Sequence, residues 1–282
     1  MKHAFNTDFL LWLDIALDDI ETARILYDKG KHRSSYFHFQ QASEKANKAF
    51  AIMAGLLTAE ELADIQHNQL KIYRKSLRKQ EVKIQEIKTV VGKLPKGSEH
   101  PFLSEDILTT QSNAMNQGIS HIDGLNNQNL KDLSLTELSA IIREIRKIDK
   151  IKIKLPKNIY PHIDKKFLEL ASWVGQFPTE EAQQAQQEYL DFVRNKEQSA
   201  EVYGYIDEVF KMAIKIGFVE TVFFYCALLT IKHSSATRYP EVDTNPLKEY
   251  HPKMAIIKKQ PAFMDLLEMA INRLKLIHDG KA

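Results

Sequence analysis

The chain has 282 residues, enough for one large domain or two modest ones, and 44% hydrophobic with 27% charged residues is typical of a globular protein. The net charge of only +2 excludes attraction of the whole molecule to nucleic acid or membrane, so such binding has to come from local patches. The single cysteine, Cys226, excludes an internal disulfide and a cysteine-rich zinc site.

The N-terminal stretch does not have the form of a signal peptide. Asp8 and Asp14 interrupt its apolar residues, and no small-residue cleavage site follows. The apolar run around Cys226 is shorter than the roughly 20 residues that a bilayer span needs. We therefore expect a cytoplasmic protein with no membrane partner.

Helix periodicity dominates the chain and strand alternation is nearly absent, which predicts an all-α fold, built as an antiparallel helical bundle. Asn6 or Thr7 is the expected cap of the first helix, which ends at Gly30. Thr58 and Glu61 form a capping box. The predicted helices cover residues 7–29, 34–54, 58–91, 103–117, 134–150, 160–175, 179–195, 197–233 and 261–277.

The loops are marked by their composition. Residues 124–129 are rich in Asn and Gln, and residues 234–246 contain two prolines that cannot lie inside a helix, Pro240 and Pro246. The last helix is expected to open at Pro261, because proline is tolerated in the first helical turn.

The helix around residues 36–49, YFHFQQASEKANKA, has an unusual polar face. Its order of residues resembles the second-helix signature of HEPN domains, which are small helical bundles. Two weaker features agree: His67 with Leu70 at the start of the next helix, and an Arg238–Tyr239–Pro240 loop before the last helix. By this resemblance, His67 and Arg238 would line a polar pocket.

The resemblance covers two separated segments. It implies a discontinuous HEPN-like bundle over residues 1–80 and 201–282, with residues 81–200 as an inserted helical subdomain. In this family the second helix lies near the self-association surface, so the resemblance implies a homo-oligomer, with a dimer expected. Specific polar contacts within or between protomers would then come from Gln40, Gln41, Glu44 and Lys48.

Many HEPN proteins are metal-independent ribonucleases with an Arg followed, after four to six residues, by a His. The chain has two such pairs, Arg33 with His38 and Arg273 with His278, where about one is expected by chance. Each His would be the acid/base and each Arg the phosphate stabiliser. The alternatives are a core or interface histidine for His38, and for His278 a helix end that favours positive charge.

Two segments concentrate positive charge. Residues 67–98 carry a net +7 and residues 143–157 a net +5. The first segment places basic side chains in two adjacent helical rows, which would contact an RNA backbone through Lys71, Arg74, Lys75 and Arg78. The alternative is a solvated helix face or a seam with an acidic helix, and Tyr73 is the only aromatic available for base stacking in that segment.

Other chemistries lack their motifs. The sequence contains no phosphate-binding glycine loop, no Cys/His zinc spacing and no dinucleotide fingerprint, so we expect no cofactor and no metal. A nucleotidyltransferase partner, common beside HEPN proteins, would be a separate chain. We predict an RNA-directed or nucleotide-binding HEPN-like protein of a defence or toxin–antitoxin system, whose catalytic form would be a metal-independent endoribonuclease. The alternative is a non-catalytic module that binds a protein or a nucleotide.

Overall fold

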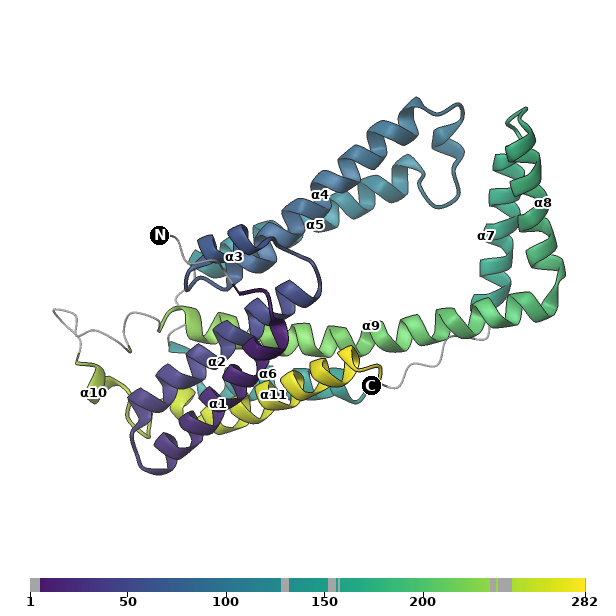
Figure 1. Cartoon of the computed structure of the whole chain (residues 1–282). Coiled ribbons are helices and arrows are strands. Elements are labelled where there is room, and N and C mark those ends of the chain that lie inside the picture. Colours follow the sequence, from purple (N-terminus) through teal and green to yellow (C-terminus); the bar gives the residue numbers. More distant parts are fainter. Residues whose placement is uncertain are drawn as a thin grey trace. The chain divides into compact units, whose positions relative to one another are not determined.

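The computed structural model describes residues 6–127, 132–151, 156, 158–233, 237 and 245–281 (Figure 1). Over these residues the only regular secondary structure is helical, which confirms the predicted all-α class. The chain forms two compact units. The first unit contains residues 1–76, 119–151 and 214–282, and the second contains residues 77–118 and 152–213.

The first unit is built around helices that lie side by side in Figure 1, α1, α2, α6 and α11. The turn between α1 and α2 contains Gly30 at φ +68°, a left-handed conformation that favours glycine. The helices of this unit are α1 (Phe9–Asp28), α2 (His32–Met53), α3 (Ala59–Ile65), α6 (Leu135–Asp149), α10 (Pro246–Glu249) and α11 (Ala255–His278). It also takes the start of α4 (Leu70–Lys93), the end of α5 (Glu105–Asn127) and the end of α9 (Lys196–Ile231).

The core of the first unit follows from the apolar stripes of these helices. The small residues Ala42, Ala46 and Ala49 of α2 are fully buried, as the spacing of the sequence predicts, and they let neighbouring helices approach closely. Around them pack the large buried side chains Leu13, Ile20, Tyr36, Phe39, Phe218, Phe223, Phe263 and Leu267.

A buried polar network crosses this core at Asn47. Its Nδ2 donates to the Gln69 side chain at 3.0 Å and to the Phe223 carbonyl at 3.1 Å, while its Oδ1 accepts from the Tyr73 hydroxyl at 2.6 Å. Ser43 donates to Gln69 as well, at 2.8 Å. These bonds fix α2 against α4 and α9, because each buried polar group there would lose energy if its partner were removed.

The second unit contains the remaining parts of α4, α5 and α9 together with α7 (Ile159–Val174), α8 (Glu180–Arg194) and a short 3₁₀ helix (Gly97–Glu99). In Figure 1, α7 and α8 form an antiparallel hairpin. Its interior is aromatic: the Phe167 and Phe192 rings lie 4.6 Å apart between centroids. The Trp173 indole donates to the Lys96 carbonyl at 2.8 Å, and His100 packs on the same indole.

Helix α9 is long and apolar enough to cross a membrane by length and composition, within the residues that the structure describes. Half of its most apolar window is buried inside the protein. Phe218, Val222 and Phe223 lie in the core of the first unit, and a core helix passes the same test.

Four predicted helix boundaries differ from the structure. Asp8, and not Asn6 or Thr7, caps α1, by accepting a hydrogen bond from the Leu11 amide. The expected helix over 58–91 is two helices, interrupted at Gln66, which has a positive φ of 52°. Helix α5 continues to Asn127, into the expected loop at 124–129. Helix α11 begins at Ala255 and contains Pro261, because burial of Ile256 and Ile257 outweighs the backbone bond that the proline removes.

The units also divide the chain differently from the predicted insertion at 81–200. Residues 119–151, which include α6, belong to the first unit. The reason is the apolar stripe of α6, where Leu138, Ile142 and Ile145 are buried in the same core as α1, α2 and α11. The identity of residues 81–200 as an evolutionary insertion stays a prediction.

Candidate active site

A cavity of about 630 Å³ opens beside the first half of α2. Five positions of α2 contribute to it, because residues three and four apart share one face of a helix. Its described lining consists of Arg33, Ser34, Phe37, His38, Gln41, His67 and Thr237. It therefore brings together one of the two predicted Arg–His pairs and the separately predicted His67.

The five-residue spacing of Arg33 and His38 separates their side chains by about 140° on a helix. Both residues nevertheless line this cavity, and Arg33 lies in the first turn of α2, which begins at His32. The Arg33 Nη1 atom donates to the Thr237 carbonyl at 2.7 Å. Within the described part of the chain this guanidinium has no carboxylate partner, and its Nε is buried without a hydrogen bond.

His38 is held by a carboxylate from α1. Its Nδ1 atom lies 2.9 Å from Asp19 Oδ1, and the other Asp19 oxygen accepts from Lys45 Nζ at 2.5 Å. A carboxylate can only accept, so Nδ1 carries the hydrogen and Nε2 is the nitrogen left for chemistry in the neutral ring. The His38 side chain is 31% exposed and that of Asp19 only 11%, so the ring edge is open while its anchor is buried.

His67 is held in the same way, by a carboxylate from α2. Its Nδ1 atom lies 2.9 Å from Glu44 Oε2, and Glu44 Oε1 accepts from Lys48 Nζ at 2.8 Å. The Glu44 and Lys48 side chains are each 9% exposed, whereas that of His67 is 51% exposed. Two residues of the polar face of α2, Glu44 and Lys48, therefore orient His67 within the protomer.

The two glutamines of the same polar face, Gln40 and Gln41, differ in position. Gln41 lines the cavity, and its Nε2 has no hydrogen-bond partner among the described residues. Gln40 is fully buried, and both polar atoms of its amide lack a partner in the same part of the chain. A contact of these two residues between protomers stays a prediction.

The second predicted pair, Arg273 and His278, is not brought together. Arg273 Nη2 lies 2.7 Å from Asp149 Oδ1, and its guanidinium lies 4.3 Å from the centroid of the Phe218 ring. It lines a different cavity, which also contains Asp265 and Glu268. His278 packs edge-on against Phe9, with 4.9 Å between ring centroids. Its position fits a helix end that favours positive charge.

The predicted basic row on α4 is partly used for structure. Arg74 makes a two-pronged pair with Asp123, at 2.7 and 3.2 Å. Lys71 and Arg78 are exposed and Lys75 is half-buried. Tyr73 is buried and donates to Asn47, so it is not positioned to stack on a base. The predicted pocket residue Arg238 lies outside the described residues.

Sequence reasoning did not single out Asp19 as a site residue. A signal was present, since Ala16, Asp19 and Ala23 fall at i, i+3 and i+7 on the buried face of α1, where a lone acid needs a partner. Within the described ranges, no three His, Cys, Asp or Glu side chains gather in a group that could hold a metal ion. Cys226 is buried in the core, and burial raises the pKa of its thiol.

The comparisons with known proteins bear on the same segment. The HEPN domain family model matches residues 9–90, which include every described lining residue of the cavity except Thr237. The chain has no significant match among curated proteins or among solved structures. The family match agrees with the resemblance that the second-helix signature carries, and it identifies residues 9–90 of this chain as a HEPN domain.

Proposed function

We propose that this HEPN domain is a metal-independent endoribonuclease whose active site is the cavity of Arg33, His38 and His67. One observation carries the proposal: a guanidinium without a carboxylate partner in the described chain shares a cavity with two histidines, each oriented through Nδ1 by a carboxylate. The first subsidiary proposal is that the RNA cleavage serves a defence or toxin–antitoxin system, and the second is that the protein acts as a homodimer.

The chemistry requires three groups. One neutral imidazole removes the proton from a ribose 2′-hydroxyl, whose oxygen then attacks the adjacent phosphorus. The P–O bond to the 5′-oxygen of the next nucleotide breaks, and the second imidazole, in its protonated form, gives that oxygen a proton. The products are a 2′,3′-cyclic phosphate and a 5′-hydroxyl, so atoms and charges balance. Arg33 stabilises the extra negative charge on the phosphorane.

The carboxylates have a positioning role. Asp19 and Glu44 accept from Nδ1–H of their histidines, and in the proposed reaction Nε2 of each ring takes or gives the proton. Lys45 and Lys48 balance the charge of these carboxylates, so the two buried acids do not add negative potential where RNA phosphates would bind.

The test is cleavage of an end-labelled RNA by the purified full-length protein in EDTA. The active-site variants are Arg33→Ala, His38→Ala and His67→Ala, and the matched control is the Arg273→Ala/His278→Ala double, which removes the same residue types from the other pair. We expect His38→Ala to lower the cleavage rate by about 10²–10⁴-fold and the control to retain it. Product with a 2′,3′-cyclic phosphate end identifies the reaction class.

Two results would overturn the proposal. If folded wild-type protein cleaves none of a panel of structured and single-stranded RNAs, the ribonuclease proposal is wrong and a non-catalytic binding module is favoured. Equal cleavage by the wild type and all three active-site variants assigns the activity to another site or to a contaminant.

A further inference from the structure

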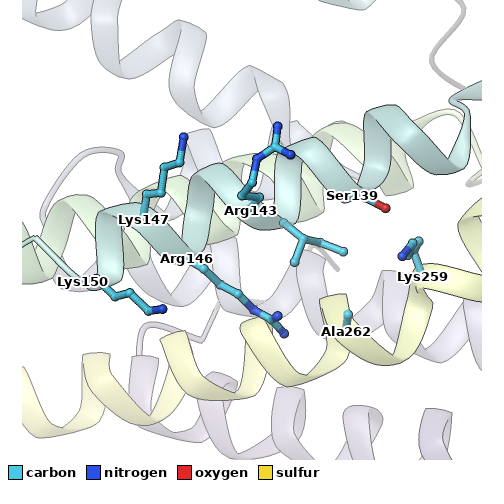
Figure 2. Close-up of a pocket in the computed structure, with 8 residues that line it drawn as sticks. Ser139, Arg143, Arg146, Lys147, Lys150, Lys259 and Ala262 are labelled. Carbon is cyan, nitrogen blue, oxygen red and sulfur yellow. The ribbon is translucent and has the colours of Figure 1, made fainter.

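A second cavity, of about 400 Å³, lies between α6 and α11 of the first unit, and its described lining shares no residue with that of the candidate active site (Figure 2). Five side chains of its described lining are cationic: three lie on α6, one belongs to the C-cap residue of α6, Lys150, and one lies on α11. Its lining consists of Ser139, Ile142, Arg143, Arg146, Lys147, Lys150, Lys259 and Ala262.

Helical spacing explains why α6 collects these charges on one side. Arg143, Arg146 with Lys147, and Lys150 follow one another at three- and four-residue steps, so they form a row along the helix. The row from Arg143 to Lys150 is about 10 Å long at 1.5 Å per residue. The neighbouring face of α6 packs into the core through Leu138, Ile142 and Ile145, so the row is held on a helix that is anchored in the core.

The charges of this cavity are only partly neutralised. Glu144 pairs with Arg143 and with Lys147, whose Nζ lies 2.9 and 3.0 Å from the two carboxylate oxygens. Within the described ranges, no acidic side chain pairs with Arg146, Lys150 or Lys259. Three positive charges held around one concavity repel one another, and an anion that binds there removes that repulsion.

The cavity also has an apolar part. Ile142 and Ala262 line it, and in Figure 2 Arg146 extends from α6 toward α11, where Lys259 and Ala262 lie. A site with several cations beside aliphatic carbon fits a ligand with phosphates and an apolar ring better than it fits an inorganic ion, which has no apolar surface to bury.

We propose that the α6–α11 cavity is a binding site for a ligand with two or more phosphates on a nucleoside framework. A single-stranded nucleic-acid segment and a free nucleoside triphosphate share this chemistry. The described lining of this site lies outside residues 9–90, the segment that the HEPN domain model matches. It does not depend on ribonuclease activity.

The test measures binding by the full-length protein at low and high salt. One probe is a fluorescein-labelled 2′-O-methyl RNA, which lacks the nucleophilic hydroxyl and cannot be cleaved, and the other is ATP, measured by calorimetry. The site variant is Arg146→Glu/Lys259→Glu. The control, Lys29→Glu/Lys253→Glu, changes the net charge equally at two exposed positions of the same unit.

We expect the site variant to bind at least one probe 10-fold or more weakly, and the control to remain within about 3-fold of wild type. For the oligonucleotide, the site variant loses two phosphate contacts. The slope of log K against the logarithm of the salt concentration should therefore become less negative by about 1.4. Loss confined to RNA identifies a strand site, and parallel loss of RNA and ATP identifies a nucleotide site. Glu144→Gln removes the carboxylate that pairs with Arg143 and Lys147. We expect this variant to bind the probes more tightly than the wild type.

Folding is controlled by circular dichroism and by the milder Arg146→Gln/Lys259→Gln variant, which removes the charges without reversing them. Wild-type affinity of the folded site variants for both probes overturns the proposal, as does a wild type that binds neither probe at low salt. Because the RNA probe cannot react, these outcomes are separate from a failure of the proposed cleavage activity.

Discussion

The Nδ1 atom of His38, on α2, lies 2.9 Å from the Oδ1 atom of Asp19, on α1. The Asp19 side chain is buried and its second oxygen accepts from Lys45. Asp19→Asn keeps the shape of the side chain but lets the amide donate, which favours the wrong tautomer of the His38 ring. We expect RNA cleavage to fall by about 100-fold or more, with the fold retained.

Asp18→Asn is the matched control, because Asp18 is the exposed neighbour on the same helix. Nitrogen NMR of the His38 ring supplies a readout that a purely structural role does not move. The tautomer should change in Asp19→Asn and stay in Asp18→Asn. An unchanged tautomer with lost activity would contradict the positioning role of Asp19.

The network around Asn47 predicts a large effect on stability. Asn47→Ala removes the partner of the buried Tyr73 hydroxyl and two bonds that tie α2 to Gln69 and the Phe223 carbonyl. Buried polar groups left without partners cost about 1–3 kcal/mol each, so we expect the free energy of unfolding to fall by about 2–4 kcal/mol. Urea unfolding followed by circular dichroism measures this change.

A double-mutant cycle isolates the bond between Asn47 and Tyr73. Tyr73→Phe removes only the hydroxyl, and in the Asn47→Ala background the same change should cost clearly less, because its partner is already gone. Additive costs in the cycle would show that the two side chains act independently.

His100 predicts a pH dependence in the second unit. Its Nδ1 accepts from the amides of Phe102 and Leu103, both at 3.1 Å, and desolvation by burial lowers the pKa of its imidazole. The unfolded chain therefore binds the proton more tightly than the native one. The stabilising contribution is present above pH 6.5, the ordinary pKa of histidine, and is lost as the pH falls from there through the lower pKa of the native state.

The measurement is urea unfolding between about pH 5 and 8, followed by Trp173 fluorescence in a Trp12→Phe background. Trp173 contacts the His100 ring at 4.5 Å between centroids and therefore reports on this region. His100→Asn keeps an acceptor for the same amides but does not titrate, so the decline toward low pH should flatten. An identical pH profile in that variant would exclude His100 as its source.

Cys226 predicts chemical inertness in the native state. Its side chain is fully buried in the core of the first unit, and burial raises the pKa of the thiol. We expect no reaction with Ellman's reagent in native buffer and one equivalent after unfolding in guanidinium. Ser98→Cys, at an exposed position, is the positive control and should react at once. Rapid labelling of Cys226 in native protein would contradict its burial.

The sequence predicted the local structure well where local physics decides it. The apolar stripes predicted the helices, Gly30 marked the end of the first, and the Thr58–Glu61 capping box marked the start of α3. The errors occurred where other contacts compete: Gln66 takes a positive φ that a side-chain pattern does not encode, and Pro261 lies inside α11 because packing outweighs one lost backbone bond.

By itself the sequence determined the all-α class, the second-helix signature and the residue types of a possible nuclease pair, since each is a matter of spacing within one helix. Only the tertiary structure shows which of these residues share a cavity and which pair elsewhere. It paired Arg273 with Asp149, and it placed His67 beside Arg33 and His38 in one cavity. Charge pairing and cavity formation depend on residues far apart in the chain, so no local pattern specifies them.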